Sequence, residues 1–99
     1  MEQNFKIAII GLGYVGLPLA ISFSKYYETI GYDIDNKKIN RLSNNNQASS
    51  VSFTNSPKDI NEANIYIVTV PTPVNSDNSP DLSFLESATK LIARYLSKN

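Results

Sequence analysis

Three glycines near the start of the chain have a spacing that is typical of phosphate binding. The pattern G-x-G-x-x-G is formed by Gly11, Gly13 and Gly16. It follows an apolar run at 6–10, which predicts a buried parallel strand, and it precedes an apolar segment with helical spacing. The first glycine permits a tight turn, the second lets backbone approach a pyrophosphate, and the third lets helix and strand pack closely. The helix N-terminus adds N–H groups and a positive dipole end, so we predict that this loop binds a dinucleotide.

An acidic residue stands where a dinucleotide-binding fold needs one, about 20 residues after the glycines. Asp33 follows a predicted strand at 29–32, and its carboxylate would accept hydrogen bonds from the adenosine ribose hydroxyls. Its charge would repel a 2′-phosphate, which favours NAD over NADP. The cations of Lys37 and Lys38 leave NADP open, because either of them could accept that phosphate.

A second reading of the same acidic segment is purely structural. Asp33 or Asp35 would cap the helix that is predicted to begin near Asn36. Both roles are compatible if Asp35 is the cap and Asp33 the ligand.

Composition limits the chemistry that the chain can perform. Its 99 residues make one domain at most, and nine acidic and nine basic residues cancel. A neutral chain offers no field that attracts nucleic acid or an anionic membrane, and no apolar run approaches the ~20 residues of a membrane span. Cysteine and histidine are both absent, so neither a metal site nor a catalytic residue is predicted. We expect a soluble, cytoplasmic α/β protein.

Hydrophobic periodicity predicts strands that alternate with helices. The predicted strands are 6–10, 29–32, 51–54 and 65–70, and the predicted helices are 14–26, 36–42, a short one from Pro57 to about Ala63, and one that begins in a capping box at Ser83 and Glu86. The first helix would bury Val15, Leu19, Ala20 and Phe23. The last would bury Phe84, Leu85, Ala88, Leu91, Ile92, Tyr95 and Leu96. Right-handed crossovers then predict a doubly wound parallel sheet of order 3-2-1-4.

A doubly wound sheet normally continues beyond its fourth strand. We therefore expect residues 1–99 to be part of a larger domain, with the fourth strand as an edge. Without further strands, we expect the chain to self-associate or to be only marginally stable. A homodimer would form by pairing that edge with the same edge of a second copy, or by exchange of the last helix between the two copies.

Three stretches together resemble the N-terminal NAD-binding domain of the UDP-glucose/GDP-mannose dehydrogenase family. They are 10–20, 31–35, and 70–73 with Pro80-Asp81-Leu82 behind it. Leu-Pro-Leu-Ala after the glycines is most similar to the UDP-N-acetylhexosamine branch. The resemblance implies a Rossmann-type fold, NAD as the cofactor, and oxidation of the sugar C6 alcohol to a carboxylate for surface polysaccharides.

The resemblance carries over cofactor contacts and no catalytic residue. It places the pyrophosphate at the glycine loop, the ribose at Asp33, the adenine near Lys38, and the segment 70–73 along the cofactor toward the nicotinamide. The predicted cofactor-binding residues are Gly11, Gly13, Tyr14, Val15, Gly16, Asp33, Lys38, Val70, Pro71, Thr72 and Pro73. The family's catalytic cysteine and its UDP-sugar contacts belong to a later region, so the resemblance implies that this chain is inactive alone. The connection at 43–50 is shorter than is usual in the family.

Two other functions remain open on the sequence. One is a stand-alone module that binds NAD or another adenine nucleotide without turnover. The other is a remnant or interaction domain that has lost its ligand. Binding of NAD would distinguish the enzyme portion and the stand-alone module from the remnant, which should not bind it. A cysteine motif downstream of this chain would distinguish the enzyme portion from the module.

Overall fold

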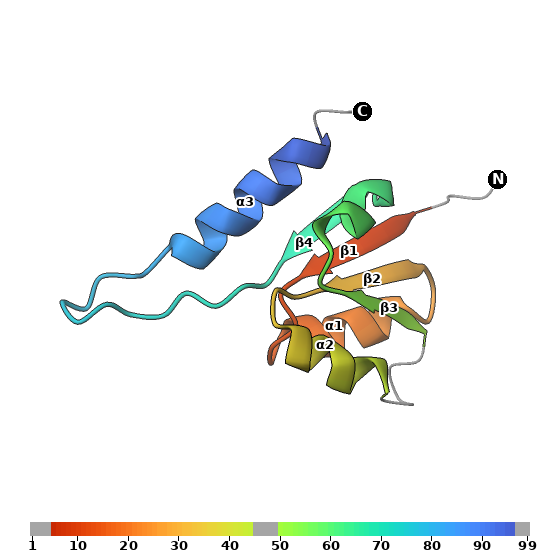
Figure 1. Cartoon of the computed structure of the whole chain (residues 1–99), viewed down its shortest axis with the longest axis horizontal. Helices are drawn as coiled ribbons and strands as arrows, with labels where there is room; N and C mark the ends of the chain where they lie inside the picture. The colour runs from red at the N-terminus through yellow and green to blue at the C-terminus, as the bar shows by residue number, and fades with distance from the viewer. Residues whose placement is uncertain (1–4, 45–49, 97–99) are drawn as a thin grey trace.

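A four-stranded parallel sheet forms the centre of the molecule. The computed structural model describes residues 5–44 and 50–96. Its strands are β1 (Lys6–Ile10), β2 (Glu28–Tyr32), β3 (Val51–Thr54) and β4 (Ile65–Val68), in the order β3-β2-β1-β4 (Figure 1). The predicted α/β class and strand order are confirmed. All three pairings are parallel, with Ile10 opposite Tyr32 on one side and Val68 on the other.

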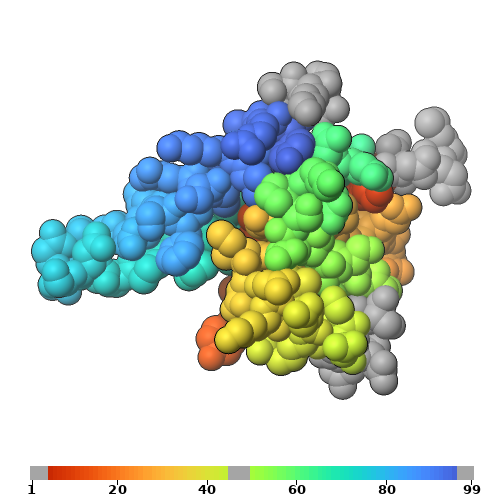
Figure 2. Space-filling model, viewed as in Figure 1, coloured from red at the N-terminus to blue at the C-terminus, as the bar shows by residue number. Residues whose placement is uncertain are grey.

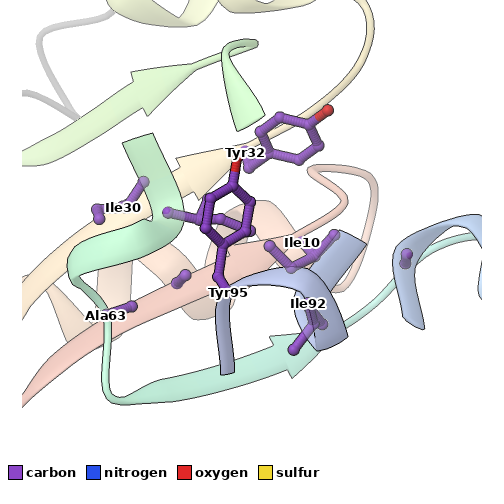
Figure 3. Close-up of a cluster of buried hydrophobic side chains, with 9 residues drawn as sticks. Ile10, Ile30, Tyr32, Ala63, Ile92 and Tyr95 are labelled. Carbon is purple, nitrogen blue, oxygen red and sulfur yellow. The ribbon is translucent and has the colours of Figure 1, made fainter. Parts of the chain in front are cut away.

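The two faces of the sheet are covered by different helices because side chains alternate along a strand. On β1, Ile7 and Ile9 pack on α1 (Gly16–Phe23) and α2 (Asn36–Ser43). Ala8 and Ile10 point the other way, toward the 3₁₀ helix η2 (Pro57–Glu62) and α3 (Ser83–Leu96). In Figure 3, Ile92 and Tyr95 of α3 lie beside Ile10 and Tyr32 of the sheet. The central strand is therefore buried on both faces.

The first helix is shorter than predicted. It covers Gly16–Phe23 rather than 14–26, and turns follow it up to Tyr27. Val15 is its N-cap and is 65% exposed, so the prediction that Val15 is buried is wrong. Gly16, not Val15, is the residue that meets the sheet, which leaves the Val15 side chain on the outer side of the loop.

The second and fourth strands also differ slightly from their predicted bounds. β2 begins one residue earlier, at Glu28, and α2 ends one residue later, at Ser43. β4 ends at Val68 rather than at residue 70. The Thr69 N–H still donates to the Ile10 carbonyl, and Pro71 and Pro73 beyond it have no N–H with which to extend the ladder. Most of the polar connection predicted at 43–50 lies outside the described residues.

The last helix buries only part of its apolar face. Ala88, Ile92 and Tyr95 are buried, whereas Phe84 and Leu85 are 46% and 38% exposed. The reason is geometric: the loop after β4 carries the chain away from the sheet, and the first half of α3 lies beyond the sheet on the way back (Figure 1). The Leu96 side chain lies outside the described side chains.

The predicted capping box at the start of α3 is not formed. Ser83 is already helical, and the Asp81 carboxylate accepts its backbone N–H at 2.9 Å. The Glu86 N–H donates to the carbonyl of Leu82. Asp81 therefore supplies the first-turn acceptor that the sequence had assigned to Ser83.

Candidate functional site

The glycine loop begins with a turn that only glycine adopts easily. Gly11 has φ +105°, and a Cβ there would lie 2.9 Å from the Thr69 carbonyl oxygen. The Gly11 N–H donates to the backbone carbonyl of Tyr32 at 2.8 Å, and the Thr69 N–H donates to the backbone carbonyl of Ile10 at 2.8 Å. The loop is thus fixed to the carboxyl ends of β2 and β4, the two strands that flank β1 in the sheet.

Gly16 fixes the other end of the loop. A Cβ on it would lie 1.8 Å from the Gly11 carbonyl oxygen and 2.4 Å from the Thr69 hydroxyl oxygen. That hydroxyl donates to the Gly11 carbonyl at 2.7 Å. The sequence reasoning missed Thr69. A small polar residue at the carboxyl end of a strand beside a glycine loop is the signal that would have found it.

The middle of the loop faces open space. A Cβ added at Gly13 would have no atom within 4 Å, and the Tyr14 side chain is fully exposed. Nothing in the fold of the described residues therefore explains a glycine at position 13. The glycine fingerprint predicts that a ligand approaches the backbone at this position, and the open space at Gly13 is compatible with that prediction.

Asp33 is held in place by three donors. The backbone N–H of Leu12 and the ammonium of Lys38 donate to Oδ2 at 2.9 and 3.3 Å, and the N–H of Asp35 donates to Oδ1 at 3.0 Å. The carboxylate thus connects the glycine loop with the start of α2. The predicted capping role of Asp35 is confirmed, because its side chain accepts the backbone N–H groups of Lys37 and Lys38 at the start of α2. The ligand role of Asp33 stays a prediction.

The environment keeps Asp33 ionised. Burial by itself raises its pKa, but hydrogen bonds from the N–H groups of Asp35 and Leu12 and from the Lys38 ammonium outweigh burial and hold the pKa below its ordinary value. Asp33 therefore presents a partly buried negative charge at the strand ends, and a carboxylate of this kind forms charge-assisted hydrogen bonds with hydroxyl donors.

A cleft of about 650 Å³ opens at the carboxyl ends of the strands. Its floor is made by Ile10, Gly11, Tyr32, Asp33, Val70 and Pro71, and Ile34 and Lys38 lie at the α2 side. The wall opposite is α3, with Ser83, Phe84, Ser87, Ala88, Lys90, Leu91 and Arg94. Figure 2 shows the arm that the loop after β4 and the first half of α3 form beside the sheet. Open α/β sheets bind ligands in a crevice outside the carboxyl ends of the strands, at the point where the strand order reverses. In this sheet that point lies between β1 and β4.

The structure brings some of the predicted residues into this cleft and leaves others outside its lining. Gly11, Asp33, Lys38, Val70 and Pro71 line it. The residues that do not are Gly13, Tyr14, Val15, Gly16, Thr72 and Pro73. Of these, Gly16 is buried behind the loop, and the other five are exposed. The α3 wall was missed, because helical periodicity assigned Phe84, Ala88 and Leu91 to packing and gave the polar residues of the wall no role.

The described residues form neither a metal site nor a membrane span. Within 5–44 and 50–96, no three acidic, histidine or cysteine side chains lie together so that they could hold a metal ion. None of the helices in these two ranges is long and apolar enough to cross a membrane.

Comparison with known proteins identifies close relatives of the whole described fold. Over 108 aligned residues the chain is 41% identical to UDP-N-acetyl-D-glucosamine 6-dehydrogenase of Salmonella typhi, covering 97% of this chain and 25% of the relative. The corresponding enzyme of Pseudomonas aeruginosa is 38% identical, with 97% and 26% covered. The solved structure of UDP-D-ManNAc dehydrogenase from Pyrococcus horikoshii superposes with a TM-score of 0.86 at 31% identity, covering 92% of this chain and 26% of that one.

These relatives are longer than this chain, which spans about a quarter of their length. The model of the UDP-glucose/GDP-mannose dehydrogenase family, NAD binding domain, matches residues 5–49 and 42–99. The two matches meet at the connection between α2 and β3, where the sequence predicted a shortening. Family model and relatives agree over nearly all of the chain. The chain therefore belongs to the UDP-glucose/GDP-mannose dehydrogenase family and represents its NAD-binding domain.

Proposed function

We propose that this chain is the cofactor-binding part of an NAD-dependent UDP-N-acetylhexosamine 6-dehydrogenase. The observation that carries the proposal is the position of the Asp33 carboxylate. It is anchored by the Leu12 N–H beside the glycine loop, and it lies in the cleft at the strand ends. The relatives are UDP-N-acetylglucosamine and UDP-N-acetylmannosamine dehydrogenases, which supports the choice of sugar class.

Each part of the site has a role in holding NAD under this proposal. The backbone at Gly13 and the N-terminal end of α1 receive the pyrophosphate, and the open space at Gly13 fits a close approach. Asp33 accepts the adenosine ribose hydroxyls. Val70 and Pro71 lie along the cofactor where the chain leaves β4. When bound, NAD supplies a hydride acceptor, and these residues bind and orient it.

Turnover would require residues that this chain does not contain. Oxidation of an alcohol to a carboxylate in two steps benefits from a nucleophile that captures the intermediate aldehyde, and cysteine is the residue best suited to that. The 99 residues include neither cysteine nor histidine. We infer that the UDP-sugar contacts and the covalent step belong to a further region, as the fourfold length of the relatives suggests.

Binding without turnover is the expected result for the purified chain. Isothermal titration with NAD should give saturable binding with micromolar affinity or weaker, because pyrophosphate and ribose contacts are present and a partner domain is not. The same protein with NAD and UDP-N-acetylglucosamine should produce no NADH absorbance. Absence of NAD binding would contradict the proposal, and sustained NADH formation would contradict the assignment of catalysis to another region.

Self-association is expected through the outer edge of the sheet. Among the described residues, β4 pairs only with β1, and Ile65 at its start is 36% exposed. We propose a homodimer in which the β4 edges of two copies pair across a two-fold axis and satisfy each other's backbone groups. Light scattering should give twice the mass of the 11.0 kDa chain. Along β4 the N–H groups alternate in direction, and that of Thr69 faces β1, so that of Val68 faces the outer edge. Replacement of Val68 by proline removes this outward donor and should yield monomer. A monomeric wild type at high concentration would refute the pairing.

A further inference from the structure

Tyr32 is a buried tyrosine whose hydroxyl has no hydrogen-bond partner in the described part of the chain. It is the last residue of β2, it is 8% exposed, and it forms part of the floor of the cleft. Every fully buried polar side-chain atom of the described residues has a partner. The phenol oxygen is therefore not fully buried, and it is the atom through which Tyr32 can reach a ligand in the cleft.

The ring of Tyr32 is held in place by packing. It belongs to the cluster that includes Ile10 and Ile92 between the sheet and α3, and Figure 3 shows its hydroxyl directed away from both of them. Burial, and then the charge of Asp33, raise the pKa of the phenol, so the hydroxyl keeps its proton at neutral pH and can both donate and accept. A side chain that is already ordered loses little entropy when it binds a ligand.

The proposed position of the ribose puts the adenine base next to this hydroxyl. Asp33, which accepts the ribose hydroxyls under the proposed function, directly follows Tyr32 in the chain. In a nucleotide the base is attached at C1′, beside the 2′-hydroxyl and across the sugar ring from the 5′-phosphate. With the pyrophosphate at the glycine loop after β1, the base extends from Asp33 away from β1, over the carboxyl end of β2.

The cleft beside Tyr32 suits a flat aromatic base. Ile34 lines it on the α2 side and is 79% exposed, and Phe84 and Leu91 line the opposite wall on α3. Apolar side chains on both sides can cover the faces of a base and bury apolar surface. The edge of the base is polar and needs a hydrogen-bonding group. Of the three hydroxyls in the lining, only that of Tyr32 belongs to a buried residue, since the two serines on α3 are exposed.

Resting on the proposed function, we propose that the Tyr32 hydroxyl forms a hydrogen bond with the polar edge of the adenine base. Tyr32 is thus a specificity-determining residue. The Asp33 carboxylate recognises a ribose, which every ribonucleotide has, whereas the Tyr32 hydroxyl contacts the base. Because this hydrogen bond forms only with the ligand, the hydroxyl contributes to binding and not to the stability of the fold.

The test replaces the hydroxyl by hydrogen and keeps the ring. In Tyr32→Phe, calorimetry with ADP should give an affinity about fivefold below that of wild type, because one neutral hydrogen bond is lost. The melting temperature should stay within about 2 °C of wild type, because no protein group loses a partner. In the wild type, nuclear Overhauser contacts should join the Tyr32 ring protons to H2 or H8 of the adenine in bound ADP.

Tyr66→Phe is the matched control. The Tyr66 hydroxyl donates to the Ile60 carbonyl at 2.6 Å, and Tyr66 does not line the cleft. Its loss should lower the melting temperature by about 4–8 °C and leave the affinity for ADP within about twofold of wild type. The two substitutions, which remove the same atom, should therefore have opposite effects on binding and on stability.

Each outcome decides the matter. An affinity for ADP in Tyr32→Phe within about twofold of wild type, or an equal loss in Tyr66→Phe, overturns the role of Tyr32, while NAD binding by the wild type leaves the proposed function standing. Loss of binding of both NAD and ADP in the wild type overturns both proposals. If Tyr32→Phe fails to fold by circular dichroism, the Overhauser contacts decide. Contacts to the adenine protons support the proposal, and contacts to ribose protons alone, or none, refute it.

Discussion

Gly13→Val is expected to abolish NAD binding without changing the fold. The added side chain meets no protein atom, since a Cβ at this position has nothing within 4 Å. It occupies instead the space through which the pyrophosphate reaches the loop backbone. Forcing methyl groups into a filled contact costs about 3 kcal/mol, which weakens binding about 100-fold. Calorimetry should give no measurable heat with NAD, while the free energy of unfolding in urea stays within about 0.5 kcal/mol of wild type.

The matched control is the same substitution three residues later. In Gly16→Val the new Cβ would lie 1.8 Å from the Gly11 carbonyl oxygen, which is backbone and has no room to move. We expect this variant to lose about 3 kcal/mol or more of stability together with NAD binding. Unaltered NAD affinity in Gly13→Val would place the pyrophosphate elsewhere. Equal destabilisation of the two variants would show that position 13 is constrained by the fold.

Asp33→Asn is expected to weaken both NAD binding and the fold, although it has the same shape. Whichever way the amide is turned, its NH₂ group faces a backbone N–H, either that of Leu12 or that of Asp35. A fully buried donor left without an acceptor costs about 1–3 kcal/mol, and since this site is only partly buried we expect a loss of stability of about 1 kcal/mol. The ribose loses a charged acceptor as well, at about 1.5–3 kcal/mol for each hydrogen bond, so affinity should fall about 100-fold.

Acid provides a second test of the same carboxylate. Because its folded-state pKa is lowered, Asp33 contributes stability that is fully present above its unfolded pKa of about 3.9 and is lost as the pH falls through the lower folded value. The difference in free energy of unfolding between wild type and Asp33→Asn should therefore be largest at neutral pH and shrink below about pH 4.

Asp35→Asn is the control, because asparagine caps a helix as well as aspartate does. It removes the same charge two residues away and should leave stability and NAD affinity nearly unchanged. A difference between wild type and Asp33→Asn that stays constant down to pH 2 would mean that the Asp33 charge does not stabilise the fold.

The sequence by itself determined the sheet and the turn geometry of the glycine loop. Strand order followed from four apolar runs, from the short distances between them and from the fixed hand of parallel crossovers. Gly11 and Gly16 were assigned their structural roles correctly, because a tight turn and a close helix contact each leave glycine as the only residue that fits. Asp35 was predicted as a cap from its position alone.

Only the tertiary structure decided which groups share the cleft. Periodicity placed Phe84 and Leu85 in the core, but burial depends on where α3 returns to the sheet, and the loop after β4 sets that point. The three donors on Asp33 come from separate segments, and no local pattern reports that Leu12 and Lys38 meet at one carboxylate. Thr69 follows β4 directly, and its hydroxyl holds the glycine loop at Gly11, 58 residues earlier in the chain. Contacts of this kind are set by the packing of distant elements, whereas turns, caps and alternation are set by neighbouring residues.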